Sequence, residues 1–251
     1  MPAIDDQAIV LRLTDYSESS QIVSLFGAEH GLLRLIAKGT RRSTRSRVAV
    51  GLDLLELGEV SFVKPREQAG LGTLTRWRLR DGFLALRRDL ALQYAGFYAA
   101  ELTLRLTAEY DPHPELFAAL LRLLRELCDL PGAGQNRVAE LVVRFQAALL
   151  RSIGYGPRLR ECVDCQRPRP RRGPVYFSSQ AGGLLCRDCA PRHHEKRPLE
   201  LRWLEPPAAR QAPLYWFELL DYHLAHLAGG PPRTAAVLCT RLGAKVHPRA
   251  T

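Results

Sequence analysis

The sequence predicts an α+β protein made of three parts: an amino-terminal five-stranded barrel, a helical bundle and an inserted zinc module held by four cysteines. Three observations support this prediction. Short apolar runs separated by turn residues fill the first 80 residues, helix-spaced apolar stripes begin at residue 81, and two CxxC pairs interrupt the second half of the chain. At 251 residues the chain is longer than one typical domain. We expect the barrel over 1–80, the first part of the helical domain over 81–161, the zinc module over 162–189 and a carboxy-terminal helical part over 190–251.

The barrel strands are expected where short apolar runs occur, at residues 8–13, 21–26, 31–37, 52–63 and 71–79. Gly58 interrupts the fourth run, as a bulge or bend would. The fifth run alternates, with Trp77 on one face and Arg76 and Arg78 on the other, which is typical of a half-buried strand. Five short strands suit an OB-fold, and strand counting does not separate it from an SH3-like barrel.

Helices are expected where apolar residues recur at a spacing of three or four. A first stripe runs from Phe83 to Leu104, a second helix lies between Pro114 and Pro131, a third extends from an N-cap at Asn136 to a stop at Gly154, and a fourth covers 214–228. The first three stripes face each other most simply in a helical bundle.

Four of the six cysteines form two CxxC pairs, Cys162 with Cys165 and Cys186 with Cys189, separated by twenty residues. Two such knuckles can point four thiolates at one ion, so the sequence predicts one structural Zn²⁺. The stretch 176–185, with Gly182-Gly183 as its turn, is expected to form a hairpin that joins the knuckles. Two disulfides, redox CxxC centres and four buried thiols are the alternatives, and a cytoplasmic location argues against disulfides.

Positive charge is concentrated between residues 34 and 47 of a chain whose formal net charge is +10. These fourteen residues contain no acidic side chain and six basic ones: Arg34, Lys38, Arg41, Arg42, Arg45 and Arg47. Residues 39–47 are too polar for a core and are expected to form a loop between two strands. The arginines of such a loop suit a phosphate backbone but cannot read base sequence alone, so we predict contact with DNA or RNA. Arg76 and Arg78 are expected to extend this surface. A solvated loop without a partner is the alternative. Trp77 and Phe62 are expected either to stack on bases or to fill the core.

The chain lacks the common motifs of nucleotide-driven and metal-dependent enzymes. It has no GxxxxGK[ST], no GxGxxG after a strand and no paired acidic motif. His193 and His194 follow the second cysteine pair without forming HExxH, and we expect surface residues there. No apolar run approaches a membrane span and no secretory signal opens the chain. We therefore expect a soluble, cytoplasmic protein that is not an enzyme.

Several segments together resemble the RecO family over nearly the whole chain. They are 8–12, Asp15-Tyr16, 21–26, 31–34 and 38–42, then the more specific 150–155, Cys162-x-x-Cys165 and Phe177-Ser178 through Gly182-Gly183 to Cys186. The resemblance implies an amino-terminal OB-fold, a helical domain and a zinc module that stabilises the fold. It also implies a nucleoid-associated protein that binds single- and double-stranded DNA, anneals strands, and works with RecR to displace single-strand-binding protein and admit RecA. The segment 231–235 departs from the family pattern, so no contact with the tail of single-strand-binding protein is assigned to it.

Two other function classes stay open on the residues alone. A zinc-dependent nuclease or deaminase needs an open metal position and a glutamate base, and a set of four thiolates argues against it. An RNA-binding OB-fold protein with a structural zinc ribbon is compatible with the composition, and only the family resemblance disfavours it.

Overall fold

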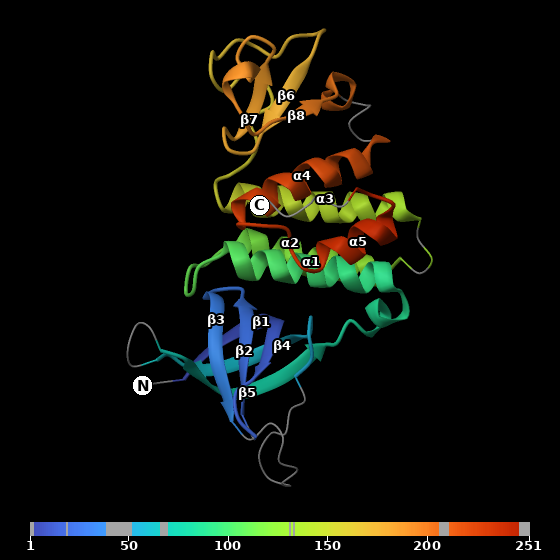
Figure 1. The fold of residues 1–251 in the computed structure, drawn as a ribbon. Coiled ribbons are helices and arrows are strands. Elements are labelled where there is room, and N and C mark those ends of the chain that lie inside the picture. The colour runs from blue at the N-terminus through green and yellow to red at the C-terminus, as the bar shows by residue number, and fades with distance from the viewer. Residues whose placement is uncertain are drawn as a thin grey trace. The chain divides into compact units, whose positions relative to one another are not determined.

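The computed structural model describes residues 3–18, 20–38, 52–65, 70–130, 132, 134–205 and 211–245 (Figure 1). The chain divides into two compact units, Met1–Gly132 and Ala133–Thr251. Within the described ranges, the first unit holds a barrel and two α-helices, and the second holds three α-helices and a small sheet. Over these residues, no helix combines the length and the apolar character that a membrane span requires.

Five described strands close into a barrel in the first unit, in the order β1-β2-β3-β5-β4. They are β1 Ile4–Asp15, β2 Ser20–Gly27, β3 Gly31–Lys38, β4 Leu57–Val63 and β5 Gly72–Asp81. Neighbouring strands are antiparallel except β3 and β5, which run parallel with Leu35 opposite Gly72. This order, closed by one parallel contact, is that of an OB-fold. The OB-fold prediction is therefore confirmed, and the SH3-like alternative is wrong.

The barrel interior is an apolar core to which every strand contributes. Phe62 and Trp77 lie in it, with 0% and 4% of their surfaces exposed, so these rings fill the core and do not stack on bases. Trp77 lies over Gly58, where a Cβ would come within 2.5 Å of the indole ring. Glycine at this position therefore admits the ring. The irregularity predicted at Gly58 is confirmed, because the register shifts between Leu57 and Gly58.

The fourth strand is shorter than the apolar run 52–63 predicted. Leu55 has a left-handed backbone with φ 68°. The turn lets the Leu55 N–H donate to the Val10 carbonyl, and the Val10 N–H donate to the Glu56 carbonyl. The strand begins after this turn, at Leu57. Leucine rarely adopts a positive φ, so the apolar residues of this run did not predict a turn at Leu55.

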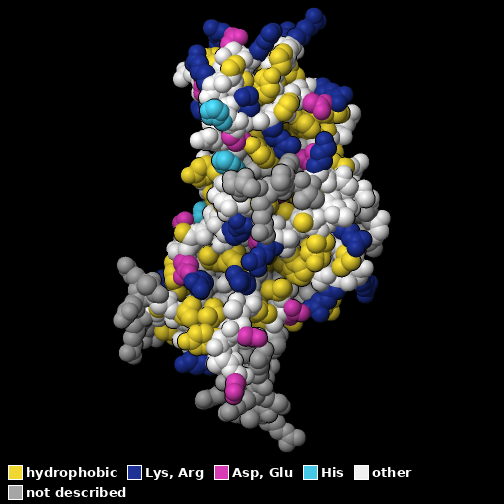
Figure 2. All heavy atoms as spheres, in the orientation of Figure 1, with side chains coloured by type: hydrophobic (Ala, Val, Ile, Leu, Met, Phe, Trp, Pro, Cys, Tyr) yellow, Lys and Arg dark blue, Asp and Glu magenta, His cyan; other side chains and the backbone are white. Residues whose placement is uncertain are grey.

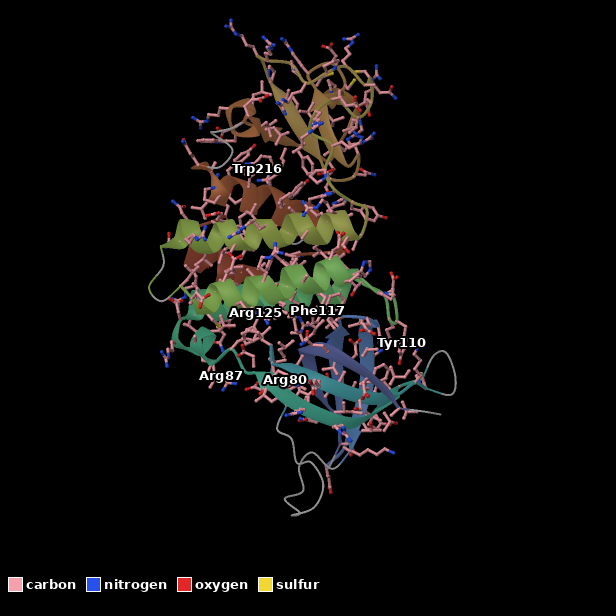
Figure 3. The ribbon with its side chains drawn as sticks, turned by 180° about the vertical axis from the view of Figure 1, so that it is seen from behind. Arg80, Arg87, Tyr110, Phe117, Arg125 and Trp216 are labelled. Atoms are coloured by element: carbon pink, nitrogen blue, oxygen red, sulfur yellow. The ribbon has the colours of Figure 1, made fainter. Side chains whose placement is uncertain are left out.

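Two α-helices of the first unit, α1 Leu90–Leu106 and α2 Pro114–Cys128, cover part of the outside of the barrel. Phe117 lies on α2 (labelled in Figure 3). Its ring centroid is 6.3 Å from that of Phe26 in β2. The stripe predicted from Phe83 is broken, because Phe83 has φ 43° and a 3-10 helix, η1 Leu84–Arg88, precedes α1. Asp89 then caps α1, with its carboxylate accepting the Ala91 N–H at 2.7 Å.

The second unit contains three described α-helices, α3 Gln135–Ser152, α4 Pro213–Leu227 and α5 Ala235–Leu242. Helices α3 and α4 pack together, and the buried Gln146 side chain donates to the Phe217 carbonyl at 3.5 Å. The N-cap of α3 is Gly134, so the prediction of Asn136 as the cap is wrong by two residues. The apolar pattern did not predict α5, because eight residues are too few to establish a helical period.

A small sheet in the order β7-β6-β8 lies beside the cysteine pairs. Its strands are β6 Val175–Ser178, β7 Gly183–Cys186 and β8 Arg197–Leu199, and two 3-10 helices, η2 Ala190–Arg192 and η3 Leu201–Leu204, flank β8. The predicted hairpin is confirmed, because Tyr176 lies opposite Leu185 and the chain turns at Gly182 with φ 75°. The third strand, β8, was not visible in the sequence pattern because it has only three residues.

Candidate functional site

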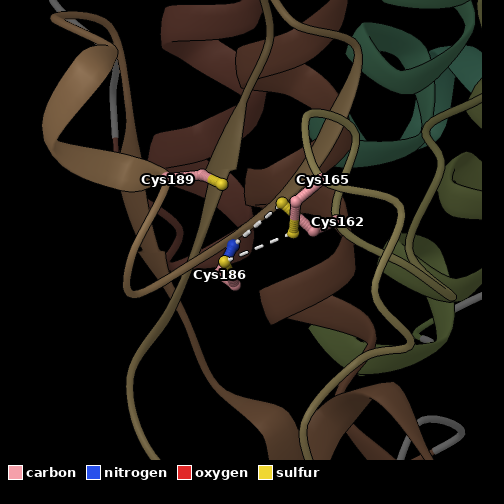
Figure 4. Close-up of side chains that lie close together, drawn as sticks. All are labelled: Cys162, Cys165, Cys186 and Cys189. Atoms are coloured by element: carbon pink, nitrogen blue, oxygen red, sulfur yellow. Dashed lines mark hydrogen bonds between the residues drawn. The ribbon is translucent and has the colours of Figure 1, made fainter.

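The four cysteines of the two CxxC pairs come together beside the small sheet (Figure 4). Their sulfur atoms all lie within 4.8 Å of one another, and the Sγ atoms of Cys165 and Cys186 are 3.8 Å apart. A tetrahedral ion with Zn–S bonds of about 2.3 Å places its sulfurs about 3.8 Å apart, so the spacing fits a metal centre. It is far longer than the roughly 2.05 Å of a disulfide bond. All six cysteines are free thiols. The cluster could therefore hold a metal ion.

Backbone amides around Cys162 favour the thiolate form of its side chain. The N–H of Cys186 donates to the Cys162 Sγ at 3.4 Å. Burial raises the pKa of the Cys162 thiol, but hydrogen bonds from the Cys165, Cys186 and Asp164 backbones outweigh it and lower this pKa to about 6. Burial and the neighbouring thiols raise the pKa of Cys189 to about 12. Four sulfurs this close cannot all ionise without a cation, so a full thiolate set requires a bound ion.

Asp164 and His193 link the first knuckle to the segment that follows the second. His193 Nε2 lies 2.9 Å from Asp164 Oδ2, and the two side chains are 22% and 27% exposed. His194 is exposed, as predicted for a surface residue. His193, in contrast, is held by the carboxylate and supports the knuckle.

Glu195 fastens the hairpin of the zinc module to α4. Its carboxylate accepts the Ser178 hydroxyl at 2.8 Å and the Gln180 N–H at 2.9 Å. It also accepts the Ser179 N–H and the Tyr222 hydroxyl. Burial alone would raise the pKa of Glu195, but the Tyr222 hydroxyl and the other donors outweigh burial and lower this pKa below its ordinary value. The Phe-Ser segment seen in the sequence therefore serves to anchor the module.

Ser179 extends this anchor through a buried histidine. Its hydroxyl lies 2.7 Å from His223 Nδ1, and His223 Nε2 lies 2.9 Å from the Tyr155 carbonyl. A carbonyl only accepts, so Nε2 carries the proton and Nδ1 accepts from Ser179. Burial lowers the pKa of His223, which favours the neutral ring. A Ser–His pair can form a nucleophile, but Ser179 is only 4% exposed, so this pair is a structural link.

A second candidate site is the outer face of β1, β2 and β3. Directly paired residues of an antiparallel ladder point to the same face of the sheet. Two complete rows cross these strands, Arg12–Ser24–Arg34 and Thr14–Ile22–Ile36. A third row pairs Ser20 with Lys38, and Tyr16, which directly follows β1, adjoins it by donating its N–H to the Ser20 carbonyl at 3.1 Å. The residues between the rows, such as Val23 and Leu35, point into the core. We call the nine outward residues the barrel face.

The barrel face combines cations, an aromatic ring and a partly buried apolar floor. Arg12, Arg34 and Lys38 are exposed, and Tyr16 is 60% exposed. Arg34 pairs with Glu109 at 3.3 Å, and both side chains are accessible enough for a phosphate to compete. Arg12 and Lys38 have no acidic partner among the described residues. Such a surface can neutralise phosphates and stack a base.

The basic residues predicted from the sequence fall into three groups. Arg34 and Lys38 lie on the barrel face. Arg76 and Arg78 are exposed on β5, where Arg78 Nη1 lies 3.8 Å from Glu59 Oε2. The loop residues Arg41, Arg42, Arg45 and Arg47 lie outside the described residues.

Sequence reasoning missed Arg12 and Tyr16. Ala8 and Val10 point into the barrel, so strict alternation would place Arg12 inside as well. The ladder shifts register between Val10 and Arg12, and this bulge turns Arg12 outward. Tyr16 stands in the Asp15-Tyr16 motif, but only its backbone hydrogen bond to Ser20 of β2 places it beside the rows of the barrel face.

Two family models cover most of the chain. The one described as "Recombination protein O N terminal" matches residues 1–83, and the one described as "Recombination protein O C terminal" matches residues 87–213. The first match corresponds to the OB-fold barrel, and the second includes the cysteine cluster.

Relatives named "DNA repair protein RecO" match the chain over long stretches. The protein of Anaeromyxobacter sp. (strain K) is 36% identical over 235 residues, which are 86% of this chain and 89% of that protein. The Rhodopirellula baltica protein is 36% identical over 186 residues, 73% of this chain and 66% of that protein. The Bacillus pumilus protein is 31% identical over 217 residues, 86% of this chain and 78% of that protein. The chain thus spans just under two thirds of the Rhodopirellula protein and most of the other two.

Proposed function

The chain belongs to the RecO family of DNA repair proteins, and from this premise we propose that it is a recombination mediator that binds single- and double-stranded DNA. In this proposal it anneals complementary strands and, with RecR, helps to load RecA onto DNA covered by single-strand-binding protein. The observation that carries the proposal is the barrel face, which places three cations and an exposed tyrosine on one side of an OB-fold. OB-folds bind oligonucleotides through this side of the barrel.

The chemistry of the barrel face suits a strand of any sequence. Each phosphate neutralised by Arg12, Arg34 or Lys38 releases condensed counterions, and this release drives binding. Tyr16 offers a π-face on which every base can stack. Contacts of these two kinds position DNA without reading base edges. We include in the same proposed site the loop arginines that follow Lys38, and Arg76 and Arg78 of β5.

We assign one structural Zn²⁺ to Cys162, Cys165, Cys186 and Cys189. Four sulfur ligands complete a tetrahedron and leave no position for a catalytic water, so the ion supplies cross-linking and no reaction. Cys162 and Cys165 hold one knuckle, and Cys186 and Cys189 hold the other. Glu195 fixes the hairpin between them. In this proposal the bound ion and Glu195 hold the module in shape, and the exposed arginines of the module are thereby kept in fixed positions.

Annealing, in this proposal, needs neither a covalent step nor a nucleotide. Neutralising phosphates lowers the repulsion between two strands, and base pairing then supplies the driving force. The sequence contains no phosphate-cradling loop that would bind ATP. The proposal therefore includes no catalytic residue.

The test is a binding and annealing measurement on the purified full-length protein with single-stranded DNA, duplex DNA and RNA of matched sequence. We expect both DNA forms to bind and annealing to accelerate. The triple variant Arg12→Ala/Arg34→Ala/Lys38→Ala should bind single strands more weakly. The slope of log K against log salt should become shallower by roughly 0.7 for each phosphate that the variant no longer neutralises.

The matched control is Arg88→Ala/Arg122→Ala/Arg241→Ala, which removes the same charge from exposed positions on η1, α2 and α5. Its salt slope should stay close to that of the unaltered protein. Equal slopes for the two triple variants would remove the barrel face from the DNA site. Tight binding of RNA with weak binding of DNA would favour the alternative, an RNA-binding OB-fold protein with a structural zinc ribbon.

A further inference from the structure

Three aromatic residues of the second unit form a partly exposed group where η3 meets the start of α4. The Tyr215 ring centroid lies 6.4 Å from that of Trp203 and 6.1 Å from that of Trp216. Trp216 and Tyr215 pack against the core of the zinc module, and Trp216 lies on the side of α4 that faces the small sheet (Figure 3). We call Trp203, Tyr215 and Trp216 the aromatic cluster.

Trp203 already accepts a planar cation on its ring at the surface. The guanidinium carbon of Arg202 lies 4.6 Å from the Trp203 ring centroid. The Arg202 side chain is itself 69% exposed and pairs with Glu200. Trp203 is not among the residues that pack against the core of the module. A nucleobase is also planar, so it can stack on the ring in place of Arg202 or on the guanidinium itself.

Basic side chains are frequent on the part of the surface formed by the zinc module (Figure 2). Two acids of this region already have basic partners: Asp188 lies 3.4 Å from Arg167, and Glu205 pairs with Arg169. Six exposed arginines in or directly beside the module have no acidic partner among the described residues: Arg158, Arg160, Arg171, Arg172, Arg187 and Arg192.

Arg169 connects these arginines with the aromatic cluster. Its side chain pairs with Glu205, which directly follows η3. Its backbone N–H donates to the Arg160 carbonyl at 2.8 Å. The two chain segments that carry Arg160 and Arg169 therefore run beside the η3 segment that carries Trp203.

We propose that the aromatic cluster and the neighbouring arginines form a second site for single-stranded DNA, distinct from the barrel face. Bases stack on Trp203 and Arg202, while phosphates contact Arg160, whose segment Arg169 joins to the end of η3. The site takes single strands because both faces of a base inside a duplex are already stacked. This inference rests on the proposed function and deepens it: annealing brings two strands together, and a second site provides a place for the second strand.

Tryptophan fluorescence of the full-length, zinc-loaded protein tests the site directly, with oligodeoxythymidylate as the probe. The chain has three tryptophans, and Trp77 is buried in the barrel core, so quenching reports on Trp203 and Trp216. We expect quenching with the single strand and much less with a duplex of the same length. Trp203→Leu should lose a large part of the quenching and weaken binding at the second site roughly 5-fold or more, the lower end of what one stacked base contributes. Trp203→Phe keeps a π-face and should stay within about 2-fold of the unaltered protein.

The barrel-face triple variant separates this inference from the proposed function. In that variant, fluorescence anisotropy of a labelled oligonucleotide should show weaker overall binding, while tryptophan quenching persists. If the unaltered protein binds the oligonucleotide by anisotropy without quenching, and Trp203→Leu binds equally well, the second site is wrong and the proposed function stands. If anisotropy shows no binding at all, both are wrong. Melting temperature and zinc content confirm that each variant is folded.

Discussion

The barrel and the zinc module both present arginines, but they are held together differently. The barrel closes five described strands around a core that includes Val23, Leu25 and Leu33. The sheet of the zinc module has strands of only three or four residues, and it depends on the cysteine cluster and on Glu195. The barrel is stabilised by many core contacts, so a substitution on its surface removes little of its stability. The small module depends on a few interactions, so the loss of one of them removes much of its stability. Single substitutions should therefore be much more damaging in the module than on the barrel.

The largest effect is expected from the cysteines. Cys162→Ser or Cys186→Ser removes one of four ligands, so the module should lose zinc and unfold locally. A structural zinc contributes on the order of 10 kcal/mol to the folding of a small domain. Elemental analysis measures the metal, and amide hydrogen exchange should rise in β6 and β7 while it stays unchanged in β1 to β3. Cys128→Ser, in α2 of the first unit, is the control and should keep its zinc. Native protein that contains no zinc would overturn this prediction.

A smaller effect is expected from Glu195. Glu195→Gln keeps the shape of the side chain but removes the charge that accepts four donors, and should destabilise the second unit by about 2 kcal/mol. The pKa of Glu195 is lowered in the folded protein, so its stabilisation is complete above the ordinary value of 4.5 and is lost as pH falls through the folded value. The free energy of unfolding, measured with denaturant, should therefore fall less between neutral and acid pH in Glu195→Gln than in the unaltered protein. Glu205→Gln, which breaks only a surface ion pair with Arg169, should cost less than about 1 kcal/mol. Equal costs for the two variants would contradict the anchoring role.

On the barrel side, substitutions should change binding and leave stability almost unaltered. Replacing Arg41, Arg42, Arg45 and Arg47 together by Ala should shift the free energy of unfolding by about 0.5 kcal/mol or less. The salt slope for single strands should become shallower by roughly 0.7 for each phosphate that is no longer neutralised. The weakening should be similar for all base sequences, because these arginines position DNA without reading it. An intact fold with an unchanged salt slope would exclude this loop. The barrel face, Arg76 and Arg78 would then remain as the proposed DNA-binding residues, together with the arginines of the zinc module, among them Arg167, Arg169, Arg171 and Arg172.

No change at all is expected when nucleotide is added. Annealing rates of the purified protein should be the same with and without ATP, because neither region contains a phosphate-cradling loop. Annealing rates measured in parallel reactions, with and without ATP and magnesium, test this expectation. A clear requirement for ATP would reveal a catalytic site that the proposal does not include.

Local sequence was sufficient for the features that depend on short-range spacing. The two CxxC pairs predicted a four-sulfur cluster, because a knuckle needs only its own few residues to turn two thiols the same way. The five strands and the hairpin around Gly182 followed from apolar runs and turn residues for the same reason. The prediction that Gly58 marks an irregularity was also local, although the ring that requires the glycine, Trp77, lies on another strand.

The tertiary structure alone decided which residues from distant segments share a surface. The bulge that turns Arg12 outward appears only in the pairing of β1 with β2, and one such shift reverses the face of every later residue. The Glu195 anchor joins α4 to the hairpin, and the aromatic cluster joins η3 to α4. Apolar periodicity describes one element at a time, whereas these sites arise from packing between elements. The parallel contact between β3 and β5 likewise joins strands that are distant in the sequence. This contact, which no local pattern predicts, makes the barrel an OB-fold.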